Sequence, residues 1–283
     1  MLKVALTHDI DRVEKTAQYL THSFRRLMQG DYKGAFQNAM NIKNRKNEYW
    51  NFERIMEIED KYSVRSTVFF LNEPVSYNFI DYRNFIHSFG RYNIKDERIT
   101  GIIKTLDKGG WEIGVHGSFN SFKSSAALKN EKNTLEEILG KEIYGIRQHY
   151  LNLIPGKTWE YQSGAGFLYD SSWGYSNQTG IKDGKVRPFA PLNNHFIVFP
   201  LFIMDYCFMQ EENRWNKFEL LCSEIEKHNG VLVINWHNNE FSRNDYPGSE
   251  EAYIECIERC SDKGAVFKCL IDFYREYIAD GTE

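Results

Sequence analysis

Short apolar runs alternate with longer amphipathic segments along most of the chain, and this alternation strongly limits the folds open to it. The apolar runs have the length and the β-branched and aromatic content of buried strands, and they are residues 3–8, 66–71, 111–117, 143–150, 166–172, 196–202 and 231–237. The segments between them have helical periodicity, and they are residues 51–62, 98–110, 129–141, 217–230 and 250–264. Strands that alternate with helices are typical of parallel sheets with right-handed crossovers. We therefore expect an α/β fold, a distorted (β/α) barrel of about seven parallel strands.

The length and composition favour one large domain. The chain has 283 residues, of which 42% are hydrophobic, and barrels of this kind commonly need about 250 residues. We expect residues 1–283 to form a single domain, residues 13–50 to be a helical insertion after the first strand, and residues 174–195 to be a loop region.

Charge and cysteine content exclude some classes of protein. The net charge of -4 and the pI of about 6.1 argue against a nucleic-acid-binding face, which would be basic. The five cysteines show no disulfide spacing, so we interpret them as free thiols in a reducing compartment. The sequence has neither a signal peptide after Met1 nor an apolar run long enough to span a membrane. We expect a cytoplasmic protein.

Polar side chains gather where the predicted strands end. In a parallel barrel the carboxyl ends of the strands meet at one rim, which holds the active site. The polar residues at these positions are Asp9, Asp11, His116, Arg147, His149, Asp170 and His237. This convergence predicts a catalytic site.

Asp9 and Asp11 face the same way if the first strand extends that far, because strand side chains alternate. Two neighbouring carboxylates repel each other unless a cation lies between or beside them, so we expect one to bind a metal and the other to act as a base. An alternative for Asp11 is a helix N-cap.

The remaining rim residues fit the same chemistry. Arg147 and His149 share a face by the same alternation, and Arg147 is suited to hold an aspartate ionised, although a structural salt bridge would look the same in the sequence. His237 ends a very apolar strand, where an imidazole suits a general acid.

The ordered set of motifs resembles the polysaccharide deacetylase family, which is carbohydrate esterase family 4-like and has the NodB-homology fold. The stretches that carry the resemblance are LTHDID at 6–11, HGSFNS at 116–121, GIRQHY at 145–150, LYDSSWGY at 168–175 and INWH at 234–237. The resemblance implies that Asp9 is the general base, that Asp11 and His116 bind a divalent metal, expected to be zinc, and that Arg147 orients the base. It also implies that His237 protonates the leaving group and that Asp170 tunes His237.

The chain departs from the family pattern at three positions. The two acids of the first motif are separated by Ile10, although they are adjacent in the commoner form of the family. Asn120 stands where the family has its second metal histidine, and an amide oxygen is a poor zinc ligand. His149 stands where the family has a proline and could supply the missing ligand. His149, Asn120 and water all remain open as the third ligand.

The resemblance implies a metal-dependent hydrolase that removes acetyl groups from N- or O-acetylated sugars, with an acetylated saccharide as its partner. The setting expected by analogy is a precursor of a surface polysaccharide. The alternatives are an amidohydrolase acting on a small non-sugar amide and a metal-free, non-catalytic saccharide-binding protein.

Overall fold

A single parallel sheet forms the centre of the molecule. The computed structural model describes residues 1–16, 18–28, 30–43, 47–73, 91–192, 195–279 and 281. Within these ranges the sheet has the strand order β6-β5-β4-β3-β2-β1-β8-β7, and β9 also pairs with β1. The strands are β1 (Lys3–Ile10), β2 (Thr67–Leu71), β3 (Glu112–Gly117), β4 (Gly145–Gln148), β5 (Tyr169–Asp170), β6 (Ile197–Val198), β7 (Leu201–Met204), β8 (Val231–Asn235) and β9 (Val266–Phe267). All their pairings are parallel. The expected α/β fold, a distorted (β/α) barrel, is confirmed, with more strands than the sequence predicted.

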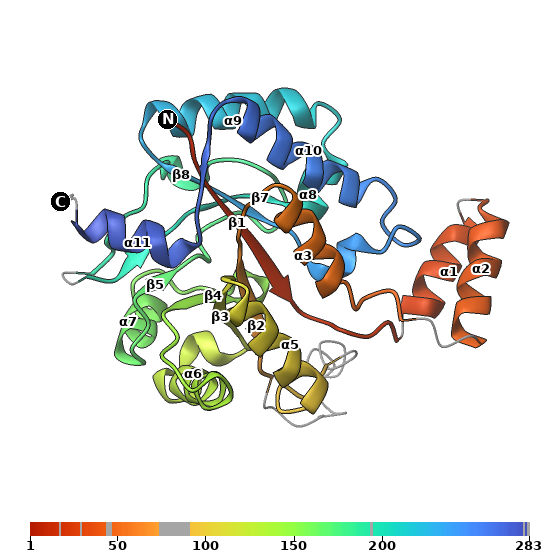
Figure 1. Ribbon diagram of the computed structural model, residues 1–283, viewed down its shortest axis with the longest axis horizontal. Helices are drawn as coiled ribbons and strands as arrows, with labels where there is room; N and C mark the ends of the chain where they lie inside the picture. The colour runs from red at the N-terminus through yellow and green to blue at the C-terminus, as the bar shows by residue number, and fades with distance from the viewer. Residues whose placement is uncertain are drawn as a thin grey trace.

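Helices surround the sheet on its outside (Figure 1). They are α1 (Gln18–Met28), α2 (Tyr32–Lys43), α3 (Phe52–Lys61), α5 (Glu97–Lys108), α6 (Ser125–Leu139), α7 (Lys157–Gly164), α8 (Asp205–Gln210), α9 (Arg214–Lys227), α10 (Ser249–Asp262) and α11 (Leu270–Ala279). The five predicted helical segments correspond to α3, α5, α6, α9 and α10. The pair of helices expected in the insertion is also present, because α1 and α2 form a hairpin that stands apart from the barrel beyond the end of β1 (Figure 1).

Local sequence signals explain where these helices begin and end. Helix α5 buries Ile99, Ile102, Ile103 and Leu106, which lie on one helical face, and the side chain of Asp96 caps its first turn. Helix α6 begins four residues before the predicted start because the hydroxyl of Ser124 accepts a hydrogen bond from the amide of Ala127. It ends at Gly140, whose φ of 72° is a left-handed conformation that favours glycine.

The predicted strand at 196–202 is wrong as a single element. It is divided into β6 and β7, with Phe199 and Pro200 between them. Proline has no amide hydrogen to donate to a neighbouring strand, so a ladder cannot continue through it. Strand β6 pairs with β5, whereas β7 pairs with β8. This segment therefore connects the two edges of the open sheet.

Strand β1 is central, and its two faces have different roles. Thr7 and Asp9 point to the interior, where both contact Arg147. His8 points to the other side, as the alternation predicted, and its ring contacts Glu59 of α3 at 2.8 Å and the carbonyl of Trp236 at 2.6 Å. The outward face of β1 thus holds α3 in place through His8. The inward face carries Asp9, which belongs to the candidate active site.

Two further expectations concern cysteines and membrane spans. All five cysteines are free, as the sequence predicted, and all five are buried. Among the described helices, none combines the length and the apolar character needed to cross a membrane.

A buried carboxyl group supports the loop that follows β3. Glu131 of α6 is fully buried, and it accepts hydrogen bonds from the hydroxyl of Ser118 at 2.5 Å and from its amide at 3.3 Å. Ser118 lies two residues after His116, so Glu131 holds the chain that carries this histidine. Burial raises the pKa of Glu131 to about 8, although the hydrogen bonds from Ser118 oppose the shift.

We predict that Glu131→Gln reduces the pH dependence of folding stability. The pKa of a glutamate in an unfolded chain is about 4.3, so between pH 5 and 8, roughly, the unfolded state binds fewer protons than the folded state does. Stability must then fall as the pH rises through this range, and glutamine removes this contribution. Urea unfolding of wild type and variant at several pH values measures it.

The matched control is Glu137→Gln in the same helix, because Glu137 is 71% exposed and pairs only loosely with Lys95 at 3.7 Å. This variant should keep the wild-type slope of stability against pH. A Glu131→Gln slope equal to that of wild type would contradict the assignment of a protonated buried carboxyl group.

Candidate metal centre and active site

The carboxyl ends of four strands of the sheet deliver polar side chains to one rim. Asp9 lies in β1, and Asp11 follows it directly. His116 lies in β3 and Arg147 in β4, and these two residues are partners in the register of the parallel pair. His237 follows β8 by two residues. Parallel strands end at the same edge of a sheet, so residues far apart in the sequence meet here.

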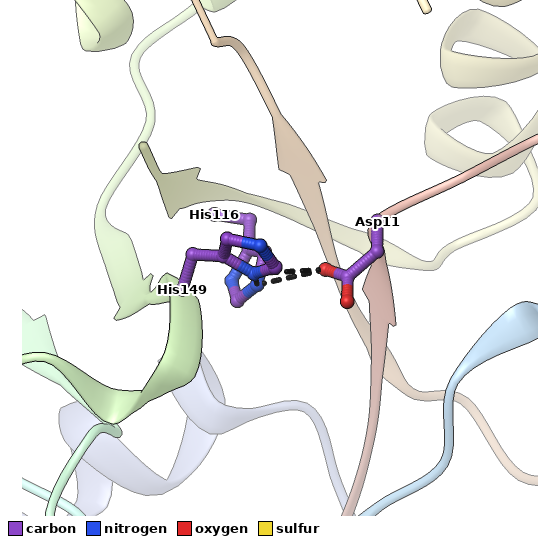
Figure 2. A group of neighbouring side chains, drawn as sticks. All are labelled: Asp11, His116 and His149. Atoms are coloured by element: carbon purple, nitrogen blue, oxygen red, sulfur yellow. Dashed lines mark hydrogen bonds and ion pairs between the residues drawn. The ribbon is translucent and has the colours of Figure 1, made fainter. Parts of the chain in front are cut away.

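Three of these side chains converge on one point. The carboxylate Oδ1 of Asp11 lies 3.1 Å from Nε2 of His116 and 3.2 Å from Nδ1 of His149. The same two nitrogens lie 3.1 Å from each other. Figure 2 shows the three side chains pointing toward one another from separate segments. Within the described residues, this is the only group of three or more histidine, cysteine or acidic side chains close enough to hold one ion.

The dimensions and the donor types of this cluster fit a small divalent cation. Oδ1 of Asp11 is buried and has no hydrogen-bond partner of acceptable geometry among the described residues. A tetrahedral ion with bonds of about 2.0–2.1 Å keeps its ligand atoms roughly 3.3 Å apart, and the three separations in the cluster are close to this value. Two imidazoles and one carboxylate are also a ligand set that leaves a coordination position open.

The orientation of each imidazole is fixed by its surroundings. Nδ1 of His116 lies 2.9 Å from the carbonyl of Arg147 and donates to it when Nε2 is the free acceptor. His149 begins the short helix η2 (His149–Leu151), in which Tyr150 and Leu151 have φ of 57° and 53°. This left-handed backbone costs about 1–2 kcal/mol per non-glycine residue. The chain thus makes a strained turn directly after the histidine that the cluster uses.

Asn120 lies outside the cluster. It is exposed and precedes the short helix η1 (Ser121–Lys123). Asn120 therefore does not replace the missing family histidine as a ligand. The third member of the group is His149.

The two neighbouring histidines stabilise the ionised form of Asp11. Burial alone would raise its pKa, but His149 and His116 outweigh burial and lower the pKa well below its ordinary value. Asp11 is therefore a carboxylate, the form that binds metal.

Asp9 takes no part in that cluster and is instead held by a buried polar network. Its Oδ1 accepts a hydrogen bond from Nη1 of Arg147 at 3.0 Å, and its Oδ2 accepts one from the side-chain Nδ2 of Asn235 at 2.9 Å. Asp9 is only 2% exposed. Burial opposes its ionisation, but the charge of Arg147, followed by those of His116 and His237, lowers the pKa of Asp9. Asp9 is therefore an oriented, ionised carboxylate that stays outside the candidate metal cluster.

His237 is paired with a carboxylate that the sequence reasoning missed. Its Nδ1 lies 2.8 Å from Oδ2 of Asp205, which also accepts from the backbone amide of His237 at 2.5 Å. Its Nε2 faces Oδ2 of Asp11 at 3.7 Å. Burial would lower the pKa of His237, but Asp205 and then the other carboxylates raise it well above its ordinary value.

The contact with His237 that was expected for Asp170 is made by Asp205. Asp170 is fully buried, and its carboxylate accepts hydrogen bonds from Gln162 at 2.9 Å and from the amide and hydroxyl of Ser172. These bonds fix the turn after β5 rather than the imidazole of His237. Asp205 directly follows β7, so the rule that polar residues at strand ends form the rim would have found it, had 196–202 not been interpreted as one strand.

A cavity of about 200 Å³ opens at this rim. Asp11, Asp205 and His237 line it, together with Tyr206 and Tyr246. A small group bound there would touch the candidate metal cluster on one side and the His237–Asp205 pair on the other.

Comparison with solved structures identifies the fold. One similar structure, from Mycobacterium smegmatis and assigned to the polysaccharide deacetylases, has a TM-score of 0.61 and 18% identity, covering 100% of this chain and 92% of that one. Puue allantoinase has a TM-score of 0.58 and 15% identity, with coverage of 98% and 90%. A Pseudomonas aeruginosa PAO1 structure, also assigned to the polysaccharide deacetylases, has a TM-score of 0.58 and 13% identity, with coverage of 98% and 90%. No protein-family model and no curated protein matches the sequence.

These similarities establish that the chain has the NodB-like fold of the polysaccharide deacetylases. The allantoinase has a similar fold over nearly its whole length, so the fold by itself does not choose the substrate.

We predict that His149→Ala weakens binding of Zn²⁺ by about 10- to 100-fold or more, a range that loss of even a supporting group can reach. Asn120→Ala should change the affinity little, because Asn120 is exposed and outside the cluster. Calorimetric titration of metal-stripped protein with Zn²⁺ compares the affinities of the two variants with that of wild type. Unchanged affinity in His149→Ala, or an equal loss in both variants, would contradict this assignment.

Proposed function

We propose that the protein is a metal-dependent hydrolase that removes acetyl groups from N- or O-acetylated saccharides, with residues 1–283 acting as one catalytic domain. The proposal is carried by the combination of three features at one rim. These are a possible metal cluster, a separate oriented carboxylate and an imidazole paired with a carboxylate. The fold of the polysaccharide deacetylases supports the choice of reaction.

Asp11, His116 and His149 would hold the metal, and we propose zinc because imidazole and carboxylate ligands around an open position suit it. A bound divalent ion supplies Lewis acidity, which polarises a carbonyl and lowers the pKa of water. Arg147 is shared between this cluster and the base, since its carbonyl faces His116 and its guanidinium faces Asp9.

Asp9 acts as the general base in this proposal. A base must be ionised and must not be consumed as a ligand, and Asp9 meets both conditions through Arg147 and Asn235. These two donors fix the plane of its carboxylate, so that Asp9 can accept a proton from the attacking water.

His237 acts as the general acid. Asp205 binds Nδ1 and thereby directs Nε2 toward the cavity, on the side of Asp11. From there His237 can donate a proton to the departing amine or alcohol of the sugar. The carboxylate of Asp205 stabilises the charged imidazole in the same way that a buried aspartate does in other catalytic histidine pairs.

The cellular setting is part of the proposal. Five free, buried cysteines suit a reducing, cytoplasmic compartment. An acetylated saccharide precursor, rather than a finished polymer outside the cell, is the substrate that we propose for such a location.

We predict that Asp9→Asn lowers kcat by about 100- to 10,000-fold, the usual contribution of a general base, while the metal stays bound. Asparagine keeps the size of the side chain but cannot accept the proton. Turnover of an acetylated sugar and the zinc content of the same sample measure the two effects separately. Loss of zinc in Asp9→Asn would show that Asp9 is a ligand and that the roles of Asp9 and Asp11 are reversed.

The experiment that tests the function itself compares substrate classes. Metal-loaded wild type should release acetate from N-acetylglucosamine oligomers or from O-acetylated xylan, and Asp11→Ala should not. Release from neither, together with hydrolysis of allantoin, would favour a small-amide hydrolase of the kind that the similar allantoinase represents. A non-catalytic binding protein would be favoured if wild type retains no stoichiometric metal and binds saccharides without hydrolysing them.

A further inference from the structure

Exposed apolar side chains are concentrated on the inserted hairpin, which stands apart from the barrel (Figure 1). Within the described part of the chain, six of the eleven exposed large hydrophobic side chains lie in α1 and α2. The six are Phe24, Leu27, Met28, Tyr32, Phe36 and Met40. Single apolar residues are ordinary on a protein surface, but a group as dense as this one marks a surface that another molecule covers.

The face of α1 that contacts the rest of the protein is polar. Gln18, His22 and Arg26 recur every four residues and therefore share one face of the helix. Gln18 is buried. His22 and Arg26 line a cavity of about 570 Å³, whose other walls are α8 and residues 240–249. Nδ1 of His22 also lies 3.2 Å from Oδ1 of Asp245. The hairpin is thus attached to the barrel through polar contacts.

The apolar face of each helix is turned to solvent instead. On α1, Phe24 and Met28 lie on the side opposite the polar contacts, and Phe24 is 66% exposed. On α2, Tyr32, Phe36 and Met40 recur every four residues and form a second stripe, in which Phe36 is 68% exposed. A helix of a globular protein normally has the reverse arrangement, with its apolar face against the core. Burial within this chain therefore does not explain these residues.

The hairpin also has little core of its own. Among the described side chains of α1 and α2, only Gln18 and Ala35 are buried. The helices have 11 and 12 residues, and helices of that length are only marginally stable without packing of an apolar face. A surface that covers the apolar stripes would supply this packing.

The charge of the hairpin indicates what kind of surface this is. Residues 18–43 contain four basic residues and one acid, Asp31, and therefore carry a net charge of +3. The whole chain carries -4, so the other residues together carry -7. Lys33 is exposed next to the stripe of α2. A partner that fits both features is apolar in its interior and anionic at its surface.

An anionic lipid bilayer has these two properties. Amphipathic helices that combine exposed phenylalanine and leucine with basic residues lie in the plane of the bilayer surface, with their apolar side chains below the headgroups. At 1.5 Å per residue, α1 and α2 are roughly 16–18 Å long. This is too short for a hydrocarbon core of about 30 Å, so the helices would lie flat. A second copy of the chain fits less well, because two facing hairpins would bring like charges together.

We propose that the α1–α2 hairpin is a docking surface for an anionic lipid bilayer, into which its exposed apolar side chains insert. The protein is then a peripheral membrane protein that is held by the hairpin. This inference does not depend on the reaction proposed for the active site.

Co-sedimentation of the full chain with lipid vesicles tests the proposal. The vesicles are pure phosphatidylcholine, or equal parts of phosphatidylcholine and anionic phosphatidylglycerol. Partition onto the anionic vesicles should be at least about tenfold stronger, since each basic residue near such a surface contributes about fivefold. Added salt should weaken the binding. The double variant Phe24→Ser, Phe36→Ser should bind at least about tenfold more weakly, because a single buried phenylalanine contributes about that much.

Matched controls come from α9, outside the hairpin. Leu220 is 63% exposed, and Leu220→Ser should bind like wild type. Lys33→Gln should weaken binding by about fivefold, whereas Lys227→Gln, at an exposed lysine of α9, should not. The lysine pair keeps the test decisive if the double variant is misfolded by circular dichroism.

Three results would overturn the proposal. The first is equal or absent binding of wild type to the two kinds of vesicle. The second is a folded double variant, or a Lys33→Gln variant, that binds anionic vesicles as strongly as wild type does. The third is a dimer of wild type, seen by light scattering without lipid, that the double variant converts to monomer, because it would assign this face to a second copy of the chain.

Discussion

The buried guanidinium of Arg147 is the constraint on which the rest of the structure depends. Arg147 is fully buried, and its donors reach Thr7, Asp9, Asn235 and Ser171. A charge in this position is tolerated only if it is paired and its hydrogen bonds are made, because removing one partner of a buried pair costs about 3–5 kcal/mol. Strands β1, β4 and β8 and the segment after β5 must therefore approach one point, and the same approach brings the rim residues together.

The pairing also separates the two aspartates of β1 into different roles. Asp9 is committed to Arg147 and Asn235, whereas Asp11 faces two histidines. The carbonyl of Arg147 in turn orients His116. One residue thus connects the proposed base to the proposed metal ligands, so a change at Arg147 would disturb both, and its effects on activity could not be assigned to either alone. The contacts of Asp205 with His237 are independent of Arg147 and give a separate way to examine the proposed acid.

The errors of the sequence interpretation have identifiable physical causes. The segment 196–202 is apolar throughout, and local composition could not show that Pro200 sends the chain from one sheet edge to the other. Interpreting it as one strand concealed Asp205, and the resemblance to the family implied Asp170 for the contact with His237 instead. The strand β9 was missed because its two residues are too few to show a pattern, and it is held by pairing with β1 from the other end of the chain. Helix α11 was also missed. The cavity beside α1 is likewise formed by three segments that are remote in the sequence.

By itself, the sequence determined the alternation of strands and helices, and with it the parallel α/β fold. It also determined most of the polar residues that end the strands, with the exception of Asp205, because apolar periodicity and strand polarity are local properties. Only the tertiary structure decided that His149 joins Asp11 and His116 while Asn120 stays exposed, and that Asp205 rather than Asp170 pairs with His237. The reason is geometric. Contacts at the rim depend on how each chain turns after its strand, such as the left-handed turn at Tyr150 and Leu151, and on which sheet edge that strand occupies.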